Sequence, residues 1–131
     1  MLSGLFSKSK TSKVDWSQLK TLSDLEELHS LSHQEPVLIF KHSTRCAISS
    51  MVLSKFQNAF EPAKAPKVYL LDLIANREVS NAASERYGVI HESPQAILVF
   101  KGEAVYNASH TGILFNEIAE KTEELKQAFT H

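Results

Sequence analysis

The sequence contains a single cysteine among its 131 residues. One thiol excludes a disulfide within the chain and any metal site built from several cysteines. An excess of charge is lacking too, because 14 Lys and Arg stand against 15 Asp and Glu for a net charge of −1. This balance gives no electrostatic reason to expect nucleic acid or a membrane surface as a partner.

Glycine and long apolar runs are also scarce. The four glycines form no phosphate-binding loop, and no apolar run approaches the roughly 20 residues of a membrane span. The first residues offer only a short apolar stretch broken by Ser3 and Gly4, less than the roughly 7–15 residues of a secretion signal. We therefore expect a cytoplasmic protein, in which a lone thiol stays reduced. The six histidines are scattered, and we predict no metal site from them.

The composition is that of one folded domain, with 43% hydrophobic and 22% charged residues. Residues 1–13 are rich in Ser and Lys, so we expect a flexible N-terminal tail there. Residues 14–131 then form a single domain.

Two hydrophobic periodicities alternate along this domain. Apolar residues at helical spacing take turns with short continuous apolar runs, which are typical of strands covered on both faces. A capping-box pattern begins at Ser23, and Gly88 predicts the end of a helix. The expected order is a helix at 23–34, a strand at 36–40, a helix at 48–60, a strand at 67–73, a helix at 79–87, strands at 96–100 and 104–106 around a turn, and a helix at 113–129.

This order predicts an α/β fold. Strand-helix-strand pieces pair in parallel, whereas the short turn at 101–103 forces an antiparallel hairpin. The result is a mixed four-stranded sheet with helices on both faces. Ile48 should begin the buried stripe of its helix, and Leu114 and Ile118 should face inward from the last helix.

Cys46 lies six residues beyond Phe40, at the junction between the first apolar strand and the following helix. The free backbone N–H groups and the positive end of the helix dipole favour an ionised thiol at this place. Arg45 adjoins it, and Lys41 and His42 are close in sequence, so nearby cations favour the thiolate further. The alternative is a small buried hydrophobe. The polar residues around Cys46 favour the reactive thiol.

Ser49 follows Cys46 by three residues, which places it on the same helical face one turn along. Dithiol redox motifs carry their second cysteine at this spacing. A serine there hydrogen-bonds a thiolate but closes no disulfide; an ordinary polar residue on an exposed turn is the alternative. Ser93-Pro94 precedes a buried strand, where a generic turn proline is the default.

The segment from Tyr87 to Glu103 resembles the thioredoxin pattern of Tyr-Gly-Val, a cis-proline and an apolar strand ending in Phe-Lys-x-Gly. The resemblance extends over about residues 15–130 and implies a thioredoxin-like fold. It also implies a cis Ser93-Pro94 bond, in a loop that packs beside the cysteine and offers backbone groups to an extended substrate.

The segment His42-Ser43-Thr44-Arg45-Cys46-Ala47-Ile48-Ser49 resembles the monothiol bacilliredoxins more narrowly. Their motif is Thr-Cys-Pro-Ile-Ser, and this chain departs from the family with Arg45 in place of Thr and Ala47 in place of Pro. The resemblance implies that Cys46 and Ser49 are the catalytic residues. Thr44, Arg45 and Ala47 then form the environment of the thiolate, and Ser93 and Pro94 form the substrate-binding loop.

The implied activity is that of a monothiol thiol-disulfide oxidoreductase, which removes bacillithiol from S-bacillithiolated client proteins. Bacillithiol is then a thiol co-substrate with no bound cofactor, and bacillithiol or another redoxin is the reductant. Two alternatives stay open. One is an iron-sulfur carrier like the monothiol glutaredoxins, and the other is a thioredoxin-fold adaptor or stress protein in which Cys46 is incidental.

Overall fold

The computed structural model describes residues 14–130, so the expected tail at residues 1–13 lies outside it. One mixed sheet has the strand order β1-β3-β2-β4-β5. β3 pairs in parallel with β1 and β2, and β4 pairs antiparallel with β2 and β5. The elements are β1 (Ser17–Gln18), α2 (Leu22–Leu31), β2 (Val37–His42), α3 (Ala47–Ala59), η1 (Pro62–Lys64), β3 (Lys67–Asp72), α4 (Arg77–Tyr87), β4 (Gln95–Phe100), β5 (Glu103–Ser109), η2 (His110–Gly112) and α5 (Phe115–Thr130).

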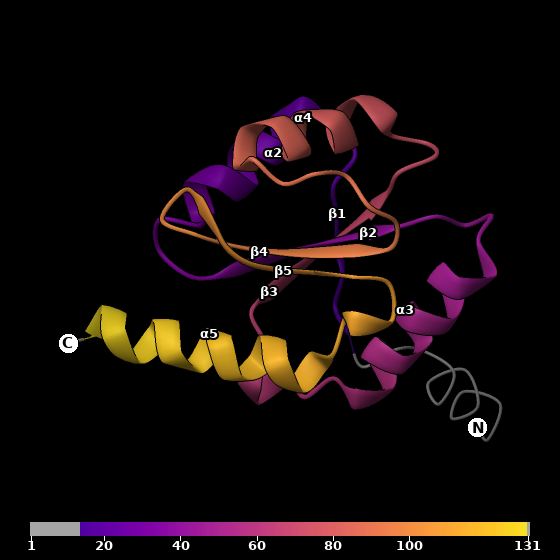
Figure 1. Ribbon diagram of the computed structural model, residues 1–131. Coiled ribbons are helices and arrows are strands. Elements are labelled where there is room, and N and C mark those ends of the chain that lie inside the picture. Colours follow the sequence, from indigo (N-terminus) through magenta and orange to yellow (C-terminus); the bar gives the residue numbers. More distant parts are fainter. Residues whose placement is uncertain (1–13, 131) are drawn as a thin grey trace, which may run out of the picture.

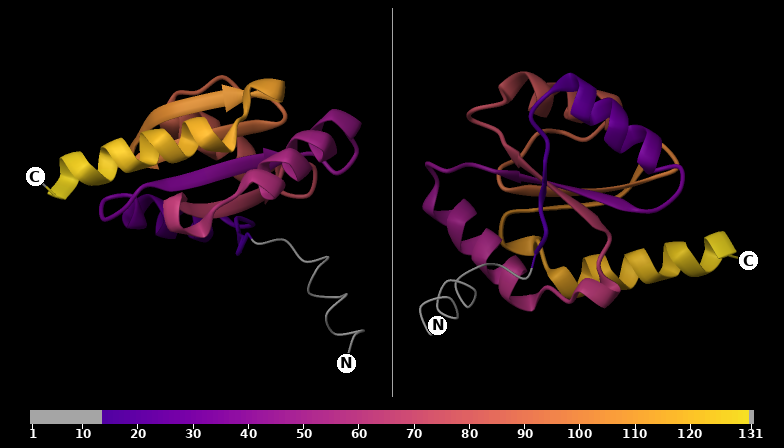
Figure 2. Two further views of the ribbon diagram at one scale, coloured as in Figure 1. Left: turned by 90° about the horizontal axis from the view of Figure 1, so that it is seen from below. Right: turned by 180° about the vertical axis from the view of Figure 1, so that it is seen from behind.

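Helices cover both faces of the sheet, as the sequence predicts. In Figure 1, α2 and α4 lie over one face, while α3 and α5 lie over the other. The view from behind in Figure 2 shows the same three layers, and in the view from below α3 and α5 lie in front of the strands. Successive residues of β2 alternate between these faces, as strand geometry requires. Leu38 and Phe40 belong to the core under α3 and α5, and Val37 and Ile39 to the core under α2 and α4.

Aromatic rings fill the core between the sheet and α3. Phe56 of α3 packs edge-on against Phe40 of β2 at 5.3 Å between ring centroids, and Trp16 contacts both rings. The Trp16 indole N–H also donates a 2.7 Å hydrogen bond to Gln57 Oε1. These contacts fix α3, and with it the residues at its start, against the central strand.

The sheet has five strands rather than the four expected. The additional strand, β1, is two residues long and pairs Ser17 with Tyr69 and Gln18 with Leu70 at the sheet edge. Its residues are polar and too few to show any periodicity, so only the pairing with β3 reveals the strand.

Three local expectations were wrong. The capping box of α2 lies two residues earlier, where Thr21 Oγ1 accepts from Asp24 N, and Asp24 Oδ2 accepts from Thr21 N. The expected box paired Ser23 with Glu26; in the structure Asp24 closes it instead, and its carboxylate also accepts from Lys20 N. Ile48 and Leu114 are 52% and 46% exposed, because each lies just before or at the start of its helix, outside the buried stripe.

Two turns require the left-handed backbone and confirm the sequence prediction. Gly88 ends α4 with φ 63°. Lys101 and Gly102 have φ 53° and 77°, the two positive values of the tight hairpin turn between β4 and β5.

Candidate functional site: Cys46 at the start of α3

Cys46 is the N-cap residue of α3, with extended backbone angles of φ −115° and ψ 120°. Its N–H donates to Ser43 O at 3.2 Å, and its carbonyl accepts from Ser50 N at 3.1 Å. The thiol is free and partly exposed, and it makes no capping hydrogen bond. The structure therefore places Cys46 at the end of α3 where the first-turn N–H groups lack helical partners and the helix dipole is positive.

The neighbours of Cys46 leave it accessible from solvent. The side chains of Thr44, Arg45 and Ala47 are exposed, whereas Ser43 is buried. The Ser43 hydroxyl accepts from Arg45 N at 3.4 Å and thereby braces the turn that leads to Cys46. A buried, inert thiol does not fit this setting.

Ser49 lies one turn after Cys46, but it is completely buried rather than exposed. Its hydroxyl oxygen accepts from Ser43 N at 3.0 Å and lies 2.7 Å from His42 Nδ1. Among the described residues, these are its hydrogen-bond partners. Ser49 therefore joins α3 to the end of β2 and holds the turn that carries Cys46.

The Ser93-Pro94 peptide bond is cis, as the resemblance implied. β2 and β4 are antiparallel, with Lys41 opposite Gln95. Pro94 therefore lies just before the start of β4, at the end of the sheet where β2 leads into the Cys46 turn. Pro94 O accepts from His110 N at 3.0 Å, which ties the loop to η2. The Ser93 hydroxyl is buried and has no hydrogen-bond partner among the described residues.

Lys41 does not face Cys46, contrary to the sequence expectation. Its ammonium lies on the α4 side of the sheet, 3.1 Å from Ser80 O, 2.7 Å from Ser84 Oγ and 3.3 Å from His91 Nδ1. The side chain is completely buried, and burial lowers the pKa of Lys41 to about 8. Lys41 is a structural cation under α4 and provides no charge to the thiol.

His42 is buried on the same side of the sheet as α3 and bonds to Ser49. Burial lowers the pKa of His42 below its ordinary value, and the nearby Asp72 carboxylate opposes that shift. Sequence reasoning treated His42 only as a nearby cation and missed its link to Ser49. The alternation of side chains along a strand could have revealed this link, because His42 lies on the same side of β2 as Leu38 and Phe40.

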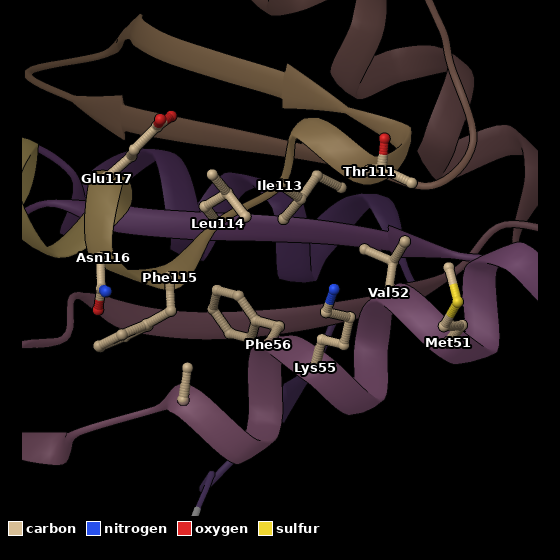
Figure 3. A pocket seen from close by; sticks show the side chains of 11 residues that line it. Met51, Val52, Lys55, Phe56, Thr111, Ile113, Leu114, Phe115, Asn116 and Glu117 are labelled. Atoms are coloured by element: carbon tan, nitrogen blue, oxygen red, sulfur yellow. The ribbon is translucent and has the colours of Figure 1, made fainter.

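An apolar cavity of about 400 Å³ lies further along α3. Figure 3 shows Met51, Val52 and Phe56 facing Ile113, Leu114 and Phe115 across it. Cys46 does not line this cavity, so the candidate site is an accessible surface at the start of the helix.

No group of three or more His, Cys, Asp and Glu side chains within residues 14–130 is placed to hold a metal ion. Over the same range, no helix combines the length and the apolar character needed to cross a bilayer.

A free cysteine at the start of a helix that follows one central strand, with a cis-proline just before the antiparallel neighbour of that strand, is the arrangement of the thioredoxin-like oxidoreductases. Solved structures agree with the fold. A candidate oxidoreductase with a thioredoxin fold is 29% identical, with a TM-score of 0.69, and the match covers 79% of this chain and 89% of that one. Thioredoxin from Trypanosoma brucei brucei is 8% identical with a TM-score of 0.68 (90% and 96% covered), and Fasciola hepatica thioredoxin is 16% identical with a TM-score of 0.64 (82% and 96% covered).

Residues 17–118 match the family model of the monothiol bacilliredoxin BrxC. The chain therefore belongs to the monothiol bacilliredoxin family, in agreement with the resemblance of the Cys46 segment.

Proposed function

We propose that this protein removes bacillithiol from S-bacillithiolated client proteins in the cytoplasm, with Cys46 as the nucleophile. The observation that carries this proposal is the lone thiol at the start of α3, with a serine where a dithiol enzyme has its second cysteine. The family match supports bacillithiol as the small thiol.

The chemistry follows from the single sulfur. The Cys46 thiolate attacks the bacillithiol sulfur of the mixed disulfide, and the client sulfur leaves as a thiolate and takes a proton from water. Cys46 then carries bacillithiol in a new disulfide, so no net oxidation has occurred. Because Ser49 closes no disulfide, a second bacillithiol or another redoxin must supply the thiolate that releases Cys46.

The Ser93-Pro94 loop binds the client next to the mixed disulfide. The loop contains the cis bond and lies at the same end of the sheet as the Cys46 turn. We assign the backbone groups of this loop to hydrogen bonds with the bound mixed disulfide or its flanking backbone. The exposed Thr44, Arg45 and Ala47 leave the sulfur open to a folded client.

Cys46→Ser tests the assignment most directly. We expect it to abolish the release of bacillithiol from a model client, because the hydroxyl is not ionised at neutral pH and cannot form the mixed disulfide. Intact-mass spectrometry of both proteins after mixing reads out the transfer. Wild type should gain one bacillithiol as the client loses one.

The matched control is Ser54→Ala, which changes an exposed position further along the same helix and should transfer bacillithiol at the wild-type rate. Full activity of the Cys46→Ser protein would refute the proposal. An iron-sulfur carrier would instead become coloured after anaerobic reconstitution with iron and sulfide, and an adaptor would leave the client modified.

A further inference from the structure

Lys41 is completely buried, and its ammonium group lies within hydrogen-bond distance of three acceptors. Two of them, Ser80 O and Ser84 Oγ, belong to α4. The third is Nδ1 of His91, at 3.3 Å, in the segment between α4 and β4 that contains the cis-proline. An ammonium group has three protons and no lone pair, so each acceptor takes one proton.

This arrangement determines the state of the His91 ring. Because a charged Lys41 only donates, Nδ1 must have a free lone pair, and the proton of the neutral ring must be on Nε2. A protonated ring has hydrogen atoms on both nitrogens, so its Nδ1–H would point at the ammonium group and the two positive charges would repel. The contact therefore exists with a neutral His91 and is lost when the ring takes up a proton.

The segment around His91 has other side-chain contacts that this proton does not remove. The Gln95 amide, at the start of β4, accepts from Glu92 N at 3.4 Å and donates to Ile90 O at 2.9 Å. The Glu92 carboxylate lies 3.1 Å from His110 Nε2 in η2. His91 adds the contact to the Lys41 side chain of β2, so its loss changes how the chain is held just before the cis-proline.

We propose that His91 is a positioning residue of the client-binding loop: its neutral ring accepts from Lys41 and holds the loop in place, and its protonation releases this hold and weakens client binding. This inference rests on the proposed function, which assigns the backbone groups of the Ser93-Pro94 loop to the client. His91 acts through the loop backbone and leaves the reactivity of the Cys46 sulfur unchanged.

The charged groups around His91 act on its protonation from several elements. Lys41 approaches the ring from β2, and Arg77 acts on it from the start of α4. Glu92, in the loop itself, acts in the opposite sense, and its carboxylate also lies beside His110. Burial, followed by the charges of Lys41 and Arg77, lowers the pKa of His91 below its ordinary value. Client binding should therefore weaken at acidic pH and stay constant near neutrality.

The Michaelis constant (KM) for an S-bacillithiolated model client, measured from about pH 7.5 to about pH 5, tests this role. His91 is exposed, and His91→Asn puts an amide oxygen, which accepts but does not titrate, near the place of Nδ1. The KM of this variant should lie within about twofold of wild type at neutral pH. At about pH 5 the wild-type KM should be about fivefold that of the variant, as for one lost hydrogen bond.

His91→Leu offers Lys41 no acceptor, so its KM should be about fivefold raised at neutral pH. All these proteins have the same Cys46, so kcat at a given pH should be equal among them. His33→Asn removes another exposed histidine and should keep the wild-type pH dependence. Equal KM values for wild type and His91→Asn at every pH would overturn the proposal, as would a lower kcat with unchanged KM in His91→Leu.

Nitrogen NMR of the His91 ring gives a second readout that needs no bacillithiol. At neutral pH, Nδ1 of the wild-type ring should be unprotonated, with the proton on Nε2. The ring of Lys41→Met, which offers Nδ1 no charge and no donor, should take up its proton at a higher pH. The opposite tautomer in wild type, or equal titration in both proteins, would overturn the proposal. A wild-type protein that passes these NMR tests but transfers no bacillithiol would refute the proposed function instead.

Discussion

Lys41 and His42 are adjacent at the end of β2, and their side chains enter opposite layers of the molecule. His42 meets a hydroxyl of α3, next to the turn that presents Cys46. Lys41 meets a carbonyl, a hydroxyl and an imidazole beneath α4. Similar polar groups on the two faces of one strand thus serve different ends. His42 bonds to Ser49, which holds the turn that carries Cys46. Lys41 holds α4 and, through His91, the segment that leads to the Ser93-Pro94 loop.

Truncation of Lys41 should show the structural side of this comparison most strongly. We expect Lys41→Ala to lower the free energy of unfolding by about 3 kcal/mol, because it leaves a cavity and deprives Ser80 O and Ser84 Oγ of a partner. Urea denaturation followed by circular dichroism measures the loss. A change below about 1 kcal/mol would show that Lys41 does not secure α4.

The titration of Lys41 makes the stability of the fold depend on pH in the alkaline range. Burial lowers the pKa of Lys41 from 10.5 to about 8, so between these values the unfolded chain binds more protons than the folded one. Stability should therefore rise with pH in this window, by about 2 kcal/mol from pH 8 to 10. Lys41→Met keeps the volume and removes the titration, so the difference between wild type and this variant isolates the effect. Parallel curves would refute it.

Alanine variants of the two serines that bond to Lys41 and His42 compare the two faces of β2 most directly. Ser84→Ala removes the shortest hydrogen bond of Lys41 and should destabilise the fold by about 1 kcal/mol. It should leave the rate at which iodoacetamide alkylates the Cys46 thiol unchanged. Ser49→Ala should change that rate, because the Ser49 hydroxyl holds the turn that carries Cys46. Slowed alkylation in Ser84→Ala would show that the two faces are coupled.

Much of this fold could be predicted from apolar periodicity. Phe40, Val52 and Phe56 are buried where the pattern indicates, and Gly88 ends its helix in the left-handed region. The pattern misplaced Ile48 and missed β1, because helix starts and two-residue edge strands bury too little apolar surface to leave a period.

The site was predictable in part for a different reason. Cys46 could be found because a strand-to-helix junction fixes its surroundings locally. The partners of Ser49 and Lys41 could not, because polar residues carry no sign of which buried group they will meet across the sheet. Ser49 was expected either to hydrogen-bond the thiolate or to lie on an exposed turn, and it is buried against His42. Only the three-dimensional register of β2 against α3 and α4 determines these pairs.

The fluorescence of Trp16 reports on the packing under α3. Trp16 is the one tryptophan of the chain, and its indole is held between Phe40 of the central strand and Phe56 of the helix that Cys46 begins. Its emission therefore reports the environment of that single layer. Excitation near 295 nm, where tryptophan alone absorbs, needs no added label. The molecule thus contains its own spectroscopic probe of the layer that supports the reactive sulfur.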